Sequence, residues 1–344
     1  MYSDSDLEGA VTAGAISREA ADALRHHIAA QRATPIVDEE QFRLLSGFND
    51  IFVSIAIVML LTALAQLGKA VATPVAGVLV AGAAWGLAEY FTRVRRMALP
   101  SILLLLAFVG GVAGALVGVM TDLHIDIPAR VGAVIAAGIA LITGGAAWLH
   151  WRRFMVPITV AAGAAAAVAV VAALTVASAP EAKELMYPTL LICGFVVFAL
   201  AMWWDISDRE RRTRRSDVAF WLHLAAAPLI AHPVFHMLGM FQGDISMVTA
   251  IVVIVLYVIF GFVALAIDRR ALLVSSLAYV LYAMYSLLQT TASLELAWGF
   301  TALAIGSALL TLSAFWHPMR ALVVGGLGDL AERLPPVGVV AARA

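Results

Sequence analysis

Three histidines within one apolar segment are the residues of this sequence best suited to do chemistry. The segment follows the arginine-rich run Arg211–Arg215 and reads SDVAFWLHLAAAPLIAHPVFHMLGM from position 216, so that it contains His223, His232 and His236. It is long enough to cross a bilayer. Histidine is the side chain whose ordinary charge change falls near neutral pH. Imidazoles at that depth are suited to bind a metal, to carry protons or to bond neighbouring helices together.

Two prolines interrupt the same segment. Pro228 removes the backbone hydrogen bond to the carbonyl of Leu224, and Pro233 does the same for Leu229. We therefore expect a helix that is kinked or broken near the middle of the bilayer, with its freed carbonyls bonded to protein or water. If the helix resumes at Pro233, the last two histidines share one of its faces.

A polar stripe on a later apolar segment offers a matching surface. Its residues lie at helical spacing along one face and run the full depth of the membrane; they are Ser275, Tyr279, Tyr282, Ser286 and Gln289. Intramembrane polar groups normally face the bundle interior or a water-filled cavity. A second polar group is expected near the outer surface and comprises Asp122, His124, Asp126, Asp244 and Glu295.

Three interpretations of these residues stay open. In the first, they bond helices together and satisfy the carbonyls that the prolines free. In the second, they line a path for a small solute or ion, since broken helices with polar groups form substrate sites in transporters. In the third, His232 and His236 bind a metal or haem, with Glu295 or His124 completing the ligand set.

Other chemistry is not indicated. The sequence contains no P-loop, no nucleophile elbow, no dinucleotide fingerprint and no HExxH motif, so enzymatic activity is not predicted and no cofactor or oligomeric state is identified. Its one cysteine, Cys193, excludes a disulfide within the chain. The arginine-rich run is expected to set topology and to bind anionic lipid headgroups rather than nucleic acid.

Hydropathy predicts the elements that position these residues. The chain is 62% hydrophobic and 13% charged, with a mean hydropathy of +0.94, whereas soluble domains are about 25% charged. Apolar stretches of about 20 residues recur after residue 50, which predicts an all-α polytopic bundle in contact with the lipid bilayer. The ten predicted spans are 50–67, 71–91, 97–120, 131–150, 154–179, 185–204, 218–241, 246–267, 271–290 and 294–316.

Positive charge predicts the orientation of the bundle. All of the 22 Lys and Arg except Lys69, Arg130 and Lys183 lie on one set of alternating segments. The positive-inside rule therefore predicts ten spans in a bacterial inner membrane with both termini in the cytoplasm. Arginines recur about every 58 residues before inside-to-outside spans, which fits a duplicated two-helix unit or the ordinary length of two-span hairpins; these arginines are Arg96, Arg153, Arg212 and Arg270.

Two further contacts are predicted from spacing. Glu89 lies four residues before Arg93, which favours an ion pair at the membrane interface over a catalytic acid. Glycines spaced by four are expected to mark close helix packing, because small residues let backbones approach in lipid; they are Gly82 and Gly86, and Gly110, Gly114 and Gly118 with Gly111 beside them.

The predicted domains are a cytoplasmic helical pair with its linker (1–37), an interfacial amphipathic helix (38–48), the membrane domain (49–318) and a cytoplasmic tail (319–344). In the pair, Gly14 ends one helix and Ser17 caps the next. The pair is too small to hold a core of its own, so it is expected to dock on something. A membrane scaffold or sensor that binds a cytoplasmic protein partner is therefore the alternative to a transporter.

The opening sequence DLEGAVTAGAISREAADALRHHIAAQR carries the pattern G-x-I-S-x-E-x-A. It resembles the short cytoplasmic helical pair that begins a group of uncharacterised bacterial multi-span membrane proteins. The resemblance covers about 30 residues and transfers no activity, because none is established for that group. Ten spans with both termini inside is also similar to the layout of drug/metabolite-type transporters, in span number only.

The alternation of charge makes a topology prediction. Reporter fusions after Leu67, Met120, Ala179, Phe241 and Thr290 should report the outside of the membrane. Fusions after Arg96, Arg153, Arg215, Arg270 and Arg320 should report the cytoplasm. A reversed pair in the interior of the chain would show that a span has been misplaced.

Overall fold

A computed structural model of the chain describes residues 10–24, 48–124, 126–181, 183–209, 211, 213–239, 246–289 and 294–337. The contacts divide the chain into two compact units. One unit comprises Met1–Phe42 with Val337–Ala344, and the other comprises Arg43–Pro336. Every regular element within the described ranges is helical.

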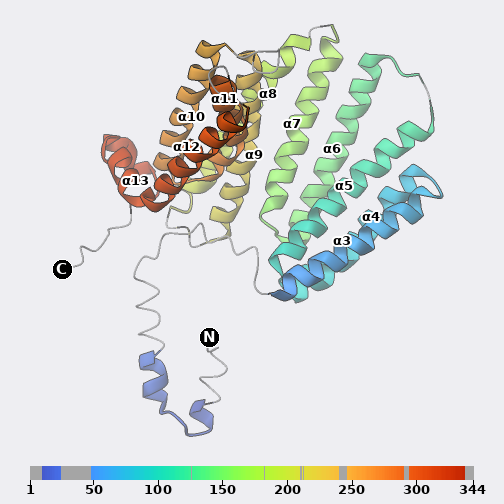
Figure 1. Cartoon of the computed structure of the whole chain (residues 1–344). Coiled ribbons are helices and arrows are strands. Elements are labelled where there is room, and N and C mark those ends of the chain that lie inside the picture. The colour runs from blue at the N-terminus through green and yellow to red at the C-terminus, as the bar shows by residue number, and fades with distance from the viewer. Residues whose placement is uncertain are drawn as a thin grey trace. The chain divides into compact units, whose positions relative to one another are not determined.

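The larger unit is a succession of long helices (Figure 1). The neighbouring pairs α4–α5, α6–α7 and α8–α9 make the most extensive contacts, and α9 also packs on α7 and α11. The elements are α3 (Phe48–Lys69), α4 (Thr73–Ala88), the π-helical η1 (Glu89–Val94), α5 (Ala98–Asp122), α6 (Ala129–Phe154), α7 (Ile158–Ser178), η2 (Lys183–Leu185), α8 (Met186–Ile206), α9 (Arg214–Met237), α10 (Met247–Ile267), α11 (Ala271–Gln289), α12 (Leu294–Ala314), α13 (Trp316–Gly325) and η3 (Gly328–Arg333).

Eight of these helices, from α3 to α10 with η1 continuing α4, are long and apolar enough to cross a membrane. A ninth crossing would consist of Trp298–Ala314 and α13, which meet at an angle of 75°. The helices α11 and α12 lie where the last two spans are predicted, and the 75° bend follows Ala314, at the end of the predicted tenth span. Helical structure continues through α13 and η3 into the predicted tail.

The outside of the bundle is apolar. Large apolar side chains stand exposed on most helices, among them Val58, Val78, Leu141, Ile192, Val255 and Leu303. Such an exterior is incompatible with water over so wide an area, whereas lipid solvates it. The chain is therefore an integral membrane protein of the all-helical class.

The described part of the N-terminal unit agrees with the local signals of its sequence. Gly14 has a left-handed backbone with φ of +71°, which glycine adopts without strain, and the chain turns there. Residues 18–24 are helical, and the backbone N–H of Ala20 donates to the hydroxyl of Ser17 over 3.1 Å. The predicted interfacial helix 38–48 lies almost wholly outside the described residues.

The packing glycines are mostly not the predicted ones. A Cβ added at Gly111 would lie 2.8 Å from backbone atoms of α4, and one at Gly118 would lie 2.7 Å from Pro74. A Cβ at Gly110, Gly114, Gly82 or Gly86 would meet nothing within 4 Å. The i, i+4 spacing identifies a helix face but not which face has a neighbour, and α4 packs instead through Gly77, against Gly111 and Ala115 of α5.

The helix α9 runs unbroken through Pro228 and Pro233, and the expected break is absent. Proline is tolerated inside a membrane helix when neighbours support the freed backbone. Here α8 packs directly on that turn, because a Cβ at Gly194 would lie 2.9 Å from the carbonyl oxygen of Leu229, the group that Pro233 leaves without its helical donor. Gly194 thus lets α8 lie directly on the weakened turn of α9.

We predict that Gly194→Ala lowers stability, because the added methyl group would press on the backbone of α9 at Leu229. Overpacking of this kind costs about 1–3 kcal/mol. Thermal unfolding of the purified protein in detergent measures the loss. Gly86→Ala is the matched control, since a Cβ there meets open space. Equal stability of the two variants would contradict the prediction.

Candidate functional site

The C-terminal half of α9 presents two of the predicted histidines to aromatic partners. The Nδ1 atom of His232 lies 2.7 Å from the hydroxyl of Tyr279 on α11. The ring of His236 stacks on Tyr187 of α8, with centroids 3.5 Å apart and planes 15° apart. The structure therefore brings His232, His236 and Tyr279 into one group and adds Tyr187, which the sequence analysis did not single out.

The predicted stripe on α11 is only partly on the packed face. Tyr279 is half-buried, whereas Tyr282 is 45% exposed. The polar residue buried on α11 is Ser276, whose hydroxyl donates to its own helix at Leu272 and Leu273. The side chains of Ser275, Ser286 and Gln289 lie outside the described residues.

The predicted outer-face cluster has a structural function where it is described. A carboxylate oxygen of Asp122 accepts the backbone N–H of Thr73 over 2.9 Å and so satisfies the start of α4. His124 has a left-handed backbone and lies with its Nδ1 2.8 Å from the carbonyl of Asp122. Asp126 is exposed. Asp244 and the side chain of Glu295 lie outside the described residues.

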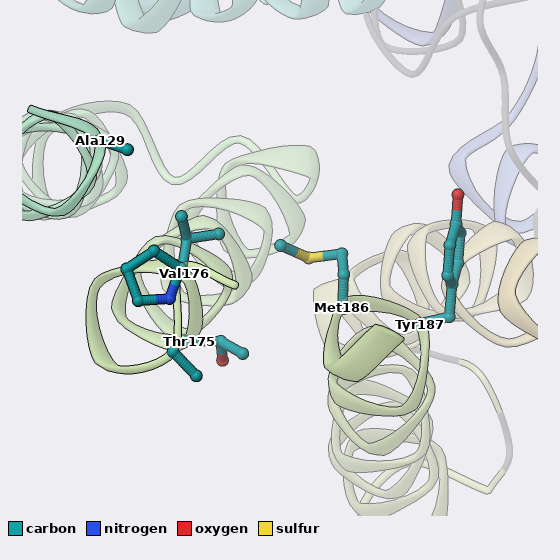
Figure 2. A pocket seen from close by; sticks show the side chains of 7 residues that line it. Ala129, Thr175, Val176, Met186 and Tyr187 are labelled. Carbon is teal, nitrogen blue, oxygen red and sulfur yellow. The ribbon is translucent and has the colours of Figure 1, made fainter. Parts of the chain in front are cut away.

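A hollow of about 450 Å³ opens beside the histidine group (Figure 2). It lies between the start of α6, the end of α7 and the start of α8, and its wall consists of Ala129, Thr175, Val176, Ala179, Pro180, Met186 and Tyr187. Met186 points across it toward α7. Because Tyr187 both lines the hollow and stacks on His236, it joins the hollow to α9.

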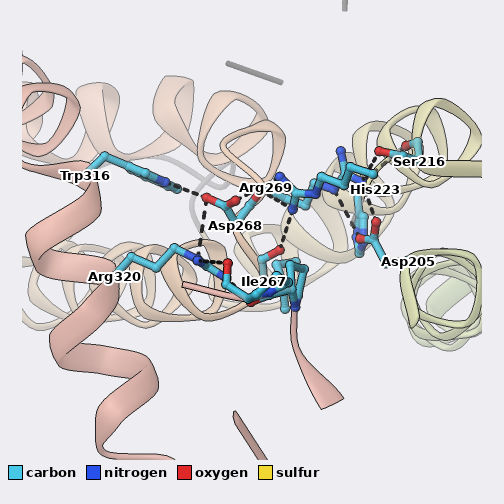
Figure 3. A network of polar contacts seen from close by, with 11 residues as sticks. Asp205, Ser216, His223, Ile267, Asp268, Arg269, Trp316 and Arg320 are labelled. Atoms are coloured by element: carbon cyan, nitrogen blue, oxygen red, sulfur yellow. Dashed lines mark hydrogen bonds and ion pairs between the residues drawn. The ribbon is translucent and has the colours of Figure 1, made fainter. Parts of the chain in front are cut away.

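A buried charged group lies at the other end of α9 (Figure 3). Asp205, near the end of α8, is 2% exposed and accepts hydrogen bonds from the Nε and Nη2 atoms of Arg269. The Nε2–H of His223 donates to the same carboxylate over 2.9 Å, because an ionised carboxylate can only accept. Arg269 also donates to the backbone and hydroxyl of Ser216. The group ties α8 and α9 to the end of α10.

A second polar network surrounds Asp268, the left-handed residue that caps α10. Its carboxylate accepts from Arg211 over 2.8 Å and from the indole N–H of Trp316 over 2.7 Å, and it lies 3.6 Å from Arg320. Arg320 in turn donates to carbonyls of Pro335 and Pro336. The loop before α9, the end of α10 and α13 are thereby joined (Figure 3).

The electrostatics of this network favour an ionised Asp268. Burial raises the pKa of its carboxyl, but Arg211, the Trp316 N–H, Arg320 and Arg269 together lower it, and the pKa lies below its ordinary value of 3.8. The carboxylate therefore contributes stability above that pH and loses it as the pH falls through the lowered pKa.

The first helices carry a similar but more exposed ion pair. Glu89 accepts from Arg153 through both oxygens, over 2.7 and 2.9 Å, and from Arg93 over 3.3 Å. The predicted pair between Glu89 and Arg93 is confirmed, while Arg153 is an additional partner from α6. Side chains of this group are 32–57% exposed, so its electrostatic contribution is weakened by solvent.

One further histidine, His150, is fully buried. The rings of Trp85, Phe108 and Phe154 surround it, and the hydroxyl of Thr159 lies 3.4 Å from its Nδ1. Its Nε2 has no hydrogen-bond partner among the described residues. In the sequence, the only signal for His150 is its position near the end of a predicted span. The neighbouring Trp148 and arginines were interpreted as signals of membrane topology.

The metal interpretation gains no support from the part of the chain that is described. There, no group of three or more His, Cys, Asp or Glu is placed to hold a metal ion. The rings of His232 and His236 lie 6.4 Å apart, and Tyr187 and Tyr279 lie beside them.

Comparison of the chain with protein-family models, curated proteins and solved structures found no match. What the site does must therefore be inferred from its own geometry. That geometry distinguishes the two halves of α9. In the N-terminal half His223 is sealed against Asp205, and in the C-terminal half His236 lies near an open hollow.

We predict that Arg269→Gln destabilises the bundle strongly, since Asp205 would remain as a buried charge with His223 as its main partner. Breaking a buried pair costs about 3–5 kcal/mol. Arg153→Gln is the control, because its pair with Glu89 is solvated and should have little effect. Chemical denaturation in detergent compares the two variants. An equal loss of stability in both variants would show that burial does not determine how much an ion pair contributes.

Proposed function

We propose that this protein is a transporter-like inner-membrane protein that moves a small solute or ion along α9, between α8 and α11. In this proposal the chain crosses the membrane ten times and both termini are cytoplasmic. The observation that carries the proposal is that each of three histidines on α9, the most buried of the eight candidate spans, meets a polar partner from a neighbouring helix.

The partners of the three histidines alternate between α8 and α11 along the length of α9. His223 meets α8 near one end of the helix, and His232 and His236 meet α11 and α8 near the other. The nine residues from His223 to His232 span about 13 Å along a helix. Ionisable side chains within membrane spans are costly to keep there, and they commonly mark substrate or proton paths.

The unbroken α9 changes where such a path runs. A substrate site formed by a broken helix is not available, so the path follows the surface of α9 rather than a gap within it. The hollow beside Tyr187 is its outer entrance, because Tyr187 reaches from the hollow to His236. His232 is exposed and hydrogen-bonded to Tyr279, and it is the next group inward.

A non-transporting scaffold or sensor is the second candidate function. It is favoured by the division of the chain into two units, which separates the N-terminal residues from the helices of the membrane. In that case the histidines hold helices together, and the N-terminal unit binds a cytoplasmic partner.

Cysteine labelling tests the transport proposal without knowledge of the substrate. In a background with Cys193 replaced by Ser, His232→Cys should react from outside with a membrane-impermeant thiol reagent. Two controls should stay unlabelled: Ile230→Cys, which is buried, and Val255→Cys, which is exposed on the apolar surface of α10.

The result that would overturn the proposal is also specific. If cysteines at positions 232 and 236 stay unlabelled, and His232→Ala and His236→Ala lower the melting temperature, the histidines are packing residues. The scaffold function then remains.

A further inference from the structure

The helices of the membrane domain repeat a pattern of chain breaks. Arg96, after α4 and η1, and His124, after α5, have positive φ angles, and so do Arg211, after α8, and Gly239, after α9. Each residue of the second pair lies about 115 residues after its counterpart. The next helices, α6 and α10, both end at left-handed caps, Met155 and Asp268. Left-handed non-glycine residues are uncommon, so this correspondence is informative.

Close helix contacts at a glycine recur with the same spacing of about 115 residues. Gly77 of α4 lies against the backbone of α5 at Ala115, and Gly194 of α8 lies against α9 at Leu229 and Ile230. Ala115 and Ile230 are again about 115 residues apart. In both places a glycine on one helix lets it approach the next helix to backbone contact.

A carboxylate–arginine pair recurs at the corresponding helix ends. Glu89 pairs with Arg153, and Asp205 pairs with Arg269, each across 64 positions of the chain. Each carboxylate lies near the end of one helix, α4 with η1 or α8. Each arginine lies within two residues of the left-handed cap two helices later.

The two sets of helices also pack against corresponding neighbours. In the first set, α3, α4 and α5 all pack against one another, and in the second set α7, α8 and α9 do so. Likewise α5 and α6 contact α7, as α9 and α10 contact α11. The sets differ at one place: α6 packs on α5, whereas α10 packs mainly on α11 and α13.

Buried positions of α5 and α9 correspond in the same register. Ser101, Leu104, Gly111 and Gly118 are buried on α5, and the residues about 115 positions later, Ser216, Ala219, Ala226 and Pro233, are buried on α9. The two helices therefore turn equivalent faces toward their neighbours.

We infer that the membrane domain contains two consecutive copies of one four-helix unit, α3–α6 and α7–α10, and that the α9 histidines are polar additions confined to the second copy. In this register the first copy has Phe108, Val117 and Thr121 where the second has His223, His232 and His236. An even number of helices per copy gives both copies the same orientation in the membrane, as in parallel transporter repeats. The arginine spacing of about 58 residues is half of this unit.

The first copy serves as an internal control for the second. The helix α5 occupies the equivalent place with apolar residues or Thr at the three positions, so the shared fold does not require imidazoles there. His232 and His236 are thus retained for binding or proton exchange rather than for packing. This inference concerns the architecture and does not depend on transport by the protein.

Replacing the outer histidines with their counterparts tests this inference. The double variant His232→Val/His236→Thr should insert, remain monodisperse in detergent and melt within about 3 °C of the wild type. Phe235→Thr, on the same helix but fully buried, should melt markedly lower and shows that the assay detects lost packing. If the histidine variant loses as much stability as Phe235→Thr, the histidines belong to the core and the inference is wrong.

Cross-linking tests the equivalence of the two copies independently. In the Cys193→Ser background, cysteine pairs at positions 89 and 153 and at 205 and 269 should both react with a bifunctional thiol reagent that spans about 10 Å. The crossed pairs, 89 with 269 and 205 with 153, should not. Efficient reaction of the crossed pairs, or of one matched pair alone, would contradict the repeat.

A glycine comparison covers the case in which cysteines at 205 and 269 prevent folding. Gly77→Ala and Gly194→Ala should lower the melting temperature together, whereas Gly82→Ala should not. An effect at only one of the two contact glycines would overturn the equivalence.

The outcomes also separate the two proposals. A well-folded His232→Val/His236→Thr variant, together with a His232→Cys variant that stays unlabelled, rejects transport and keeps the repeat. Labelling of His232→Cys, together with an unfolded double variant, does the reverse.

Discussion

The buried carboxylate of Asp205 is the constraint on which the arrangement of α8, α9 and α10 depends. An ionised carboxylate removed from water is costly unless it is paired and hydrogen-bonded, and here Arg269 and His223 both donate to it. Arg269 has the same requirement and meets it through Asp205 and Ser216. No one of the three helices can shift at this end without exposing an unpaired charge to an apolar surrounding. Charge pairing, rather than apolar packing alone, therefore fixes their register.

Lipid explains why the helices were predictable and their partners were not. Backbone groups in a bilayer must bond within the segment, so apolar stretches of sufficient length become helices wherever they occur. The predicted spans accordingly agree with α3 to α10 within a few residues. Which face of each helix is covered depends on neighbours distant in sequence. Gly110 and Gly114 have the expected spacing but face open space, while Gly77 and Gly194 have no such pattern and lie against the backbone of a neighbouring helix.

The candidate site was likewise only partly predictable from the sequence. The histidines of α9 stood out because imidazole is rare in apolar segments, and the structure gives each of them a partner. Asp205 and Arg269 did not stand out, because charged residues are common at the ends of spans. The positive charge of Arg269 was already explained by the positive-inside rule. Proline was misleading for a similar reason. Pro233 does free the carbonyl of Leu229, but a glycine on another helix supports that turn, and no local signal reveals it.

The two ends of α9 have different freedom to move. At one end His223, Asp205 and Arg269 are sealed, and Asp268 with its arginines fastens the adjoining loop and α13. At the other end the contacts include an aromatic stack and a hydrogen bond to a tyrosine, beside an open hollow. Stacks and neutral hydrogen bonds exchange more easily than buried ion pairs, because they leave no charge unpaired when they open. The buried ion pairs therefore hold the Asp205 end of α9 more firmly than the stack and the hydrogen bond hold His236 and His232.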